Sequence, residues 1–341
     1  MKVGTFEHKA GSKGRIIAVG GAKGGVGKSL LAANLGVYLA SRGFRTVVVD
    51  LDLGAANLHL YLGAWALKYR INDYLDKKVR DLSAIAVSTD YGLQLIGGGS
   101  SRLGSANLPF ARKLKLMRAI RDINADYVIL DLGGDTSYNI LDFFLLADSG
   151  LVLTTCDPAA YLDAYTFIKM ALYRRLVRLF GPESIYRRFR DNTLAALIRG
   201  FVSPDSTEPP GRIAELLEQT RCEAPERHHL VETAVRDYRP RLVVNMADNG
   251  DDVQALVQRM QKVSQRILSV RVELAGTIPT SADIARSARD LKPEVGRNPY
   301  GTFARAIRQI IRNTAKPPRV SSALPGDSVQ HSNHIAFMTG S

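Results

Sequence analysis

Long apolar runs are missing from this sequence, and no stretch approaches the roughly 20 consecutive apolar residues that a membrane-spanning helix needs. Cysteine is scarce, because Cys156 and Cys222 are the only two. Two cysteines exclude a disulfide framework and a four-cysteine zinc site. Residues 1–15 are polar and basic and contain no apolar segment of the signal-peptide kind. We therefore expect a protein of the reducing cytoplasm.

Acidic residues are outnumbered by basic ones, which leaves a net charge of +13. This balance favours anionic partners, namely nucleotide phosphates, nucleic acid or an anionic membrane surface. It equally suits a well-solvated surface, so the charge alone does not choose among these. The 341 residues suffice for one large α/β domain or for two small ones.

Short β-branched runs alternate with longer helical patterns, which is typical of βαβ units around a mostly parallel sheet. Runs such as 47–49 and 127–130 are apolar on both faces, as strands between two helix layers must be. The pattern predicts a doubly wound domain. We predict strands at 15–20, 45–50, 92–96, 127–131, 150–154, 241–245 and 272–276, and helices at 28–41, 110–124, 161–180 and 251–268.

Three segments interrupt this alternation. Residues 1–14 are predicted to form a flexible arm, and residues 315–341 a polar, disordered tail. Residues 181–238 separate two strands by more than one crossover helix requires. We predict a mostly helical insertion there, within a domain that covers 15–314.

A glycine-rich loop follows the first strand. Residues 21–29 read Gly-Ala-Lys-Gly-Gly-Val-Gly-Lys-Ser and continue directly into a helix. Glycines let backbone N–H groups turn towards a polyphosphate, and the helix N-terminus adds partial positive charge. Lys28 is placed to reach the β- and γ-phosphates of ATP, and the Ser29 hydroxyl to bind Mg²⁺. The pattern G-x-x-x-x-G-K-[ST] is missed by one residue, since Ala22 replaces its first glycine. The predicted nucleotide-binding residues of the loop are Lys23, Gly24, Gly25, Val26, Gly27, Lys28, Ser29 and Leu30.

Carboxylates end two of the predicted strands. Asp50 and Asp52 share one face of their strand, where they can serve one Mg²⁺ and one water molecule, although paired aspartates also occur as turn residues. Asp131 ends the apolar run 127–131, which is a Walker B pattern. The predicted metal-binding residues are Ser29, Asp50, Asp52 and Asp131.

With Lys23 in front of Gly-Gly-Val-Gly-Lys-Ser, the loop resembles the deviant Walker A motif of the MinD/ParA family of P-loop ATPases, the SIMIBI class. The resemblance covers about 15–312, apart from the insertion. It implies a slow, partner-stimulated ATPase that uses ATP and Mg²⁺ and forms a homodimer when ATP binds. It also implies catalytic roles for Lys23, which reaches the partner's phosphates, for Lys28, and for Asp52, which orients the attacking water while Asp50 supports the metal.

The same resemblance extends to two further segments. Gly133 and Gly134 are similar to the part of the family that senses the γ-phosphate, but Asp135 stands where the family has glycine. This departure keeps open an ATP-binding adaptor with negligible turnover. Asn245 and Pro279 follow late strands in positions where family members contact adenine.

Residues 50–59 (Asp-Leu-Asp-Leu-Gly-Ala-Ala-Asn-Leu-His) and 139–144 (Asn-Ile-Leu-Asp-Phe-Phe) are most similar to the FlhG/FleN branch, the regulators of flagellar number. The activation motif Asp-Gln-Ala-x-x-Leu-Arg of that branch is missing from residues 1–14. The resemblance implies a spatial regulator whose protein partner belongs to the flagellar machinery or to its regulation.

Two segments suggest contacts with other surfaces. The first is a basic strip within residues 169–190. In a ParA-like protein this strip would bind DNA phosphates nonspecifically. Otherwise it would face a partner protein, anionic lipid or solvent. Residues 300–314 predict either a last core helix or a helix that contacts the inner face of the cell membrane. The apolar cluster 335–338 is another candidate for such peripheral contact. The basic strip consists of Lys169, Arg174, Arg175, Arg178, Arg187, Arg188 and Arg190.

Overall fold

A central sheet organises the computed structural model, which describes residues 14–54, 56–99, 108–180, 192–202 and 211–315. Its eight strands have the order β3-β4-β2-β5-β1-β6-β7-β8. Neighbouring strands are parallel except for β3, which runs antiparallel to β4. The strands are β1 (Arg15–Gly20), β2 (Thr46–Asp50), β3 (Val87–Ser88), β4 (Gln94–Ile96), β5 (Tyr127–Asp131), β6 (Ser149–Thr154), β7 (Arg241–Ala247) and β8 (Glu273–Pro279).

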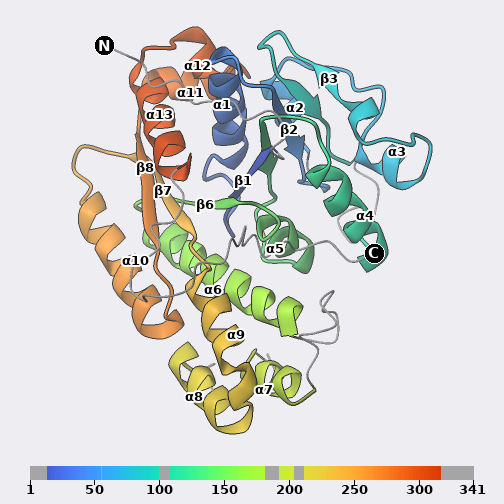
Figure 1. Cartoon of the computed structure of the whole chain (residues 1–341). Helices are drawn as coiled ribbons and strands as arrows, with labels where there is room; N and C mark the ends of the chain where they lie inside the picture. Colours follow the sequence, from blue (N-terminus) through green and yellow to red (C-terminus); the bar gives the residue numbers. More distant parts are fainter. Residues whose placement is uncertain (1–13, 55, 100–107, 181–191, 203–210, 316–341) are drawn as a thin grey trace, which may run out of the picture.

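Helices cover both faces of the sheet (Figure 1). Because successive strand residues point to opposite faces, Ile16 and Ala18 of β1 join one core while Ile17 and Val19 join the other. Helices α1 and α13 pack on the second face, and α4, α5 and α6 on the first. The predicted doubly wound α/β fold is confirmed. The helices are α1 (Lys28–Ser41), α2 (Leu58–Tyr61), α3 (Ile71–Leu75), α4 (Phe110–Arg121), α5 (Tyr138–Phe144), α6 (Pro158–Phe180), α7 (Asn192–Val202), α8 (Ile213–Glu223), α9 (Pro225–Arg236), α10 (Val253–Leu268), α11 (Ala282–Arg289), α12 (Glu294–Arg297) and α13 (Thr302–Ala315), with the 3-10 turn η1 (Ser83–Ile85).

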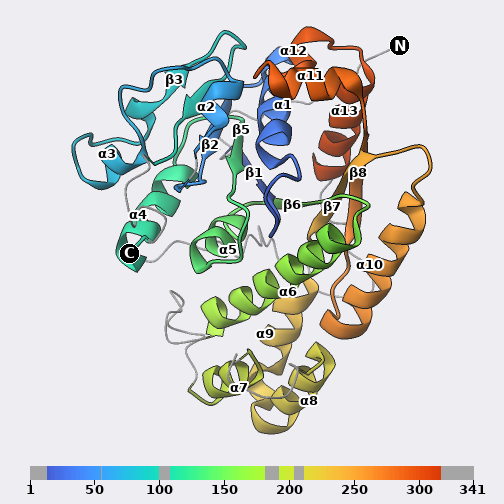
Figure 2. The ribbon, with the colours of Figure 1, turned by 180° about the vertical axis from the view of Figure 1, so that it is seen from behind.

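Helices α7, α8 and α9 form a group of their own beside α6, at the end of the molecule opposite α11 and α12 (Figures 1 and 2). They lie within the segment 181–238 that we predict to be a helical insertion. Leu194 and Ile198 of α7 are buried, as are Leu216 of α8 and Val231 of α9, and all four belong to the same core as α6. The group is therefore packed onto the domain.

Element boundaries differ from the predicted ones for local reasons. Helix α6 begins at Pro158 and not at residue 161, because proline fits the first turn of a helix. Strand β7 continues to Ala247, past a bulge in which Met246 has a positive φ of 53°. Five short helices, α2, α3, α5, α11 and α12, and strand β3 were not predicted, because elements of two to eight residues are too short to show a period.

The apolar face of α13 lies in the core. Phe303, Ile307, Ile310 and Ile311 are buried in the cluster that contains α1 and the sheet. The core-helix interpretation is thus correct and the membrane-helix alternative is wrong for this segment, since the sheet already covers its apolar side. No described helix is both long and apolar enough to cross a membrane. The apolar cluster 335–338 lies outside the described residues.

Three arginines of the basic strip are not available to DNA. Arg174, Arg175 and Arg178 are buried. Arg174 forms two hydrogen bonds of 2.8 and 2.9 Å with Asp142 of α5, and Arg178 approaches the same carboxylate to 3.1 Å. Arg175 donates instead to the backbone oxygen of Ala234 at 2.9 Å. These guanidinium groups tie α6 to α5 and α9 and cannot reach a phosphate backbone. The remaining arginines of the strip, Arg187, Arg188 and Arg190, lie outside the described residues.

Candidate functional site

The loop 21–27 joins β1 to α1 at the carboxyl edge of the sheet. Strand β1 lies between β5 and β6, so this is the point at which the chain changes direction across the sheet, where ligands bind in such folds. Gly25 and Gly27 have φ values of 79° and 94°, a left-handed conformation that side chains rarely adopt. A Cβ atom at Gly24 or Gly25 would meet nothing within 4 Å. The loop backbone is therefore open to a ligand.

Lys28 is held inside this loop. Its Nζ donates a hydrogen bond of 2.7 Å to the backbone oxygen of Lys23, and its side chain is buried. Burial lowers the pKa of Lys28, while the charges of Asp131, Asp52 and Asp135 oppose that shift. The ammonium group thus faces several carboxylates, as a group that neutralises phosphate charge next to a metal site would.

Asp50 and Asp131 lie side by side on β2 and β5. Both are buried. Asp50 accepts backbone N–H bonds of 3.1 Å from both Asp52 and Leu58. Burial, followed by the charge of Asp131, raises the pKa of Asp50 well above its usual range. Burial likewise raises the pKa of Asp131 to about 7, although a hydrogen bond from Ser29 and the charge of Lys28 lower it.

The residues present fit a Mg²⁺ ion. Oδ1 of Asp131 is buried and has no hydrogen-bond partner, and the Ser29 hydroxyl bonds to the same carboxyl group. Within the described ranges, no group of three or more His, Cys, Asp or Glu side chains could hold a metal alone. Mg²⁺ usually takes only one or two carboxylates and completes its shell with phosphate oxygens and water. Ser29 and Asp131 are suited to be the protein ligands of such a shell. Asp50, which accepts two backbone N–H bonds, is suited to fixing the end of β2 beside them.

The segment after β5 touches the phosphate-binding loop. A Cβ atom at Gly134 would lie 3.0 Å from both the backbone nitrogen of Gly24 and Nζ of Lys28. A Cβ atom at Gly133 would lie 3.5 Å from Cγ of Asp52. A side chain at Gly134 would crowd this contact, and a phosphate bound in the loop would meet the segment directly.

Asp135 follows these glycines but turns towards α5. Its Oδ1 accepts the backbone N–H of Ser137 at 2.7 Å, and Ser137 caps the helix by accepting from Ile140. The carboxylate therefore helps to start α5, and its negative charge still acts on Lys28.

Lys23 points to the start of α6. Its Nζ lies 3.2 Å from Oδ2 of Asp157, and the two side chains are 40% and 53% exposed. An exposed pair of this kind is weak, on the order of 1 kcal/mol or less. Lys23 is therefore held loosely within its own chain.

The two residues predicted to contact adenine lie at the ends of β7 and β8. Asn245 is buried, and its Nδ2 donates a hydrogen bond of 2.8 Å to the backbone oxygen of Val26. Pro279 pairs with Ala247 at the end of β8. Asn245 thus ties the phosphate-binding loop to the end of β7. Its contact with adenine stays a prediction.

Comparison with known proteins agrees with this geometry. The model of the CobQ/CobB/MinD/ParA nucleotide binding domain matches residues 17–294. The chain belongs to this family. The family predicted from the loop sequence is therefore confirmed.

Curated relatives of this CobQ/CobB/MinD/ParA-family chain include two flagellar proteins. It is 32% identical to the flagellum site-determining protein YlxH of Helicobacter pylori over 48% of this chain and 55% of that protein. It is 29% identical to the antiactivator FleN of Pseudomonas aeruginosa over 46% of this chain and 56% of that protein. The chain thus spans about half the length of these relatives. The cell division ATPase MinD of Pyrococcus furiosus has a similar fold, with a TM-score of 0.56 at 18% identity over 88% of this chain and 98% of that one.

The fold of this family member brings together most of the predicted site. The loop, the carboxylates at the ends of β2 and β5, and the two glycines after β5 are all in mutual contact or adjacent. Two contributors were missed. Asp157 is one, and Gly98 is the other, since a Cβ atom there would lie 3.2 Å from Cγ of Asp50. The run Gly97-Gly98-Gly99 after β4 was the available signal for the second.

Proposed function

We propose that this chain binds ATP with Mg²⁺, hydrolyses it slowly, and uses ATP to close a homodimer that controls the number or placement of flagella. The contact between Gly134 and the phosphate-binding loop carries this proposal, because a γ-phosphate in the loop would displace or order the segment that leads into α5. A MinD from Pyrococcus horikoshii, similar in fold with a TM-score of 0.56, is a complex with Mg-ADP.

Each residue of the site has a task in this proposal. Backbone N–H groups of the loop bind the phosphates, and Lys28 compensates their charge. Ser29 and Asp131 hold Mg²⁺, which when bound neutralises charge on the phosphate oxygens. Asp52 lies beside Gly133 and would orient the attacking water. Lys23 would exchange Asp157 for the phosphates of the second protomer.

The flagellar part of the proposal is supported by the similarity to YlxH and FleN. The partner would be a protein of the flagellar machinery or a regulator of it, and peripheral contact with the inner face of the cell membrane is compatible with the switch. Light scattering tests the dimer: ATP should double the mass in solution and ADP should not. A phosphate-release assay tests turnover. ATP binding without any phosphate release would favour an adaptor without turnover over the proposed ATPase.

A second candidate, a ParA-like protein that positions cargo on DNA, is favoured by one surface. Arg259, Lys262 and Arg266 are exposed on one face of α10 and form no ion pair within the described part of the chain. Such a face would bind DNA nonspecifically, with affinity that falls steeply with salt. ATP-dependent cosedimentation with DNA, weakened by reversal of these charges, would support the second candidate over the first.

A further inference from the structure

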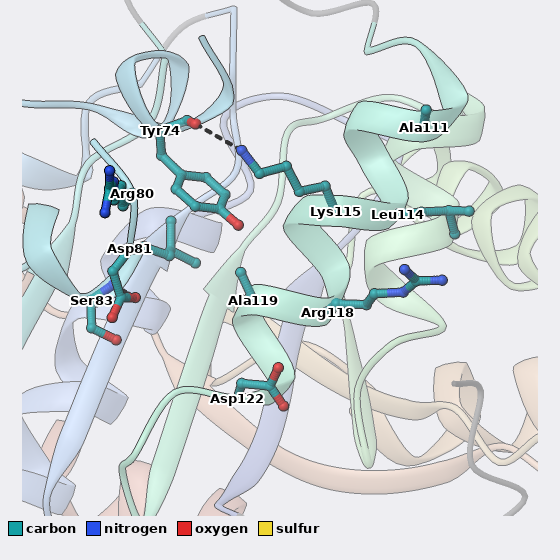
Figure 3. A pocket seen from close by; sticks show the side chains of 11 residues that line it. Tyr74, Arg80, Asp81, Ser83, Ala111, Leu114, Lys115, Arg118, Ala119 and Asp122 are labelled. Carbon is teal, nitrogen blue, oxygen red and sulfur yellow. Dashed lines mark hydrogen bonds between the residues drawn. The ribbon is translucent and has the colours of Figure 1, made fainter. Parts of the chain in front are cut away.

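A groove lies on the far side of α4 from the sheet and takes no part in the nucleotide site. It runs between α4 and the segment that leads from α3 to η1, and its cavity has a volume of about 650 Å³ (Figure 3). The wall formed by α4 extends from Ala111 to Asp122. At 1.5 Å per residue this wall is about 16 Å long, enough for roughly five residues of an extended peptide.

The groove is held open by contacts between its walls. Lys115 of α4 donates to the backbone oxygen of Tyr74 at 3.1 Å, and its ammonium lies 4.1 Å from the centre of the Tyr74 ring (Figure 3). Arg112 of α4 pairs with Asp76 beyond α3 at 3.0 Å. Two links join the same elements, and the groove is already present in the free chain.

The floor and the rim differ in chemistry. Leu82 is buried at the floor, and Ala111, Leu114 and Ala119 line the helix side. Residues 111 and 119 are alanine, which leaves room for an apolar side chain of a ligand to approach the helix backbone. The floor thus offers apolar contact in a channel with polar walls.

The rim carries basic groups that nothing in the structure engages. Arg80 is exposed on one wall and Arg118 on the other. Neither side chain has an ion pair or a hydrogen bond within the described residues. The lining also contains two carboxylates, Asp122 and Asp81, and Oδ1 of Asp81 accepts the backbone N–H of Ser83 at 2.9 Å. Three basic side chains, Arg80, Lys115 and Arg118, outnumber these two carboxylates, so the lining has a small excess of positive charge.

We propose that this groove is a docking site for a partner protein, which inserts a short extended segment with an apolar side chain flanked by carboxylates. The guanidinium groups of Arg80 and Arg118 bind the carboxylates from opposite walls, since arginine pairs with carboxylate through two parallel hydrogen bonds. The apolar side chain packs against Leu114 and Ala119 on the helix side of the groove. Since the groove is separate from the phosphate-binding loop, this partner can bind whatever the nucleotide state.

Fluorescence anisotropy on the full chain tests the proposal. The probe is a short capped peptide with leucine and phenylalanine at its centre and glutamate on both sides, and its counterpart carries lysine in place of glutamate. The wild-type chain should bind the glutamate peptide in preference to the lysine peptide. Two charge reversals, Arg80→Glu with Arg118→Glu, should weaken the glutamate peptide on the order of tenfold and favour the lysine peptide.

Two further variants make the result specific. Arg286→Glu with Arg289→Glu on α11 changes the net charge equally at a distant exposed site and should leave peptide binding unchanged. Ala119→Phe should abolish binding by filling the space beside the helix wall of the groove. Equal binding of both peptides to the wild type, or equal loss in the α11 variant, would overturn the proposal. So would self-association that disappears in the Arg80 and Arg118 variant without any peptide binding, because the groove would then hold a second copy of the chain.

Discussion

Two lysines of one loop are held differently, and this contrast can be tested at the scale of single residues. Lys28 is buried inside the loop, whereas Lys23 is exposed and held by a weak pair with Asp157. Lys28→Ala should lose Mg-ATP binding in isothermal titration calorimetry, because the phosphate charge is left uncompensated. Lys23→Ala should bind ATP with near wild-type affinity and yet stay monomeric in light scattering. Unchanged ATP affinity in the Lys28 variant would contradict the assignment of the loop.

Asp52 is predicted to act on water and not on binding. Its carboxylate lies beside Gly133, where the segment after β5 passes the loop. Asp52→Ala should keep ATP affinity, lower phosphate release on the order of a hundredfold or more, as expected for loss of a general base or orienting group, and leave a persistent dimer with ATP. Wild-type turnover in this variant would show that another group orients the water.

At the scale of elements, the long strands and the helices next to them were predictable, since β1, β5 and α1 have the predicted bounds. The strands are apolar on both faces, α1 is an apolar helix buried on nearly all sides, and local propensity agrees with the packing. The short elements around the groove were not predictable, because α3 and η1 are held by contacts with α4, such as that of Lys115 with Tyr74.

The role of the basic residues on α6 was also beyond prediction from sequence. Arg174 and Arg178 look like a solvated strip in the sequence, yet both point to Asp142, about thirty residues earlier in the chain. A carboxylate on another helix cannot be paired with them from spacing alone. The residues of the nucleotide site could be brought together from the sequence, because they all follow strands whose carboxyl ends meet at one edge of the sheet.

Asp142 should be essential for the stability of the element pair α5 and α6. Burial alone would raise the pKa of Asp142, but the hydrogen bonds of Arg174 and the charges of Arg178, Arg174 and Lys113 outweigh it and hold this pKa below its usual range. Asp142→Asn leaves buried cations without their anion and should lower the free energy of unfolding in urea by about 3–5 kcal/mol at neutral pH. Asp290→Asn removes an exposed partner of Arg297 and should cost about 1 kcal/mol or less.

The pH dependence of this effect follows from the sign of the shift. Because the pKa of Asp142 is lower in the folded than in the unfolded state, its stabilisation is fully present above the ordinary carboxyl pKa of about 4 and is lost as the pH falls through the folded pKa. The difference between wild type and Asp142→Asn should therefore shrink in acid. A difference that is constant from neutral pH to about pH 3 would show that packing, and not the charge, is responsible.

At the scale of the whole molecule, α6 connects the nucleotide site with the helices α7 to α9 (Figure 2). It starts next to Asp157, which pairs with Lys23. Its Arg174 pairs with Asp142 of α5, the helix that follows the two glycines after β5. The other end of α6 packs against α7. Its 23 residues span about 34 Å. A change at the phosphates therefore has a rigid element through which it can reach the part of the fold that we expect to add partner specificity.

The output of that switch is predicted to be flagellar. The similarity to YlxH and FleN covers about half of this chain, and Arg174 and Arg178 of the strip that favoured DNA are buried in an ion cluster with Asp142. ATP-driven closure would create a surface that neither monomer has, next to α6 and the helices it supports. Deletion of the gene should thus change the number or position of flagella, counted by electron microscopy, and leave chromosome and plasmid inheritance intact. The Lys23→Ala variant should fail to restore the wild-type pattern, because it cannot dimerise.

Normal flagella together with anucleate cells or plasmid loss would favour the DNA-based alternative, with α10 as its binding face. In a host without flagella the switch mechanism would stand and only the cargo would change.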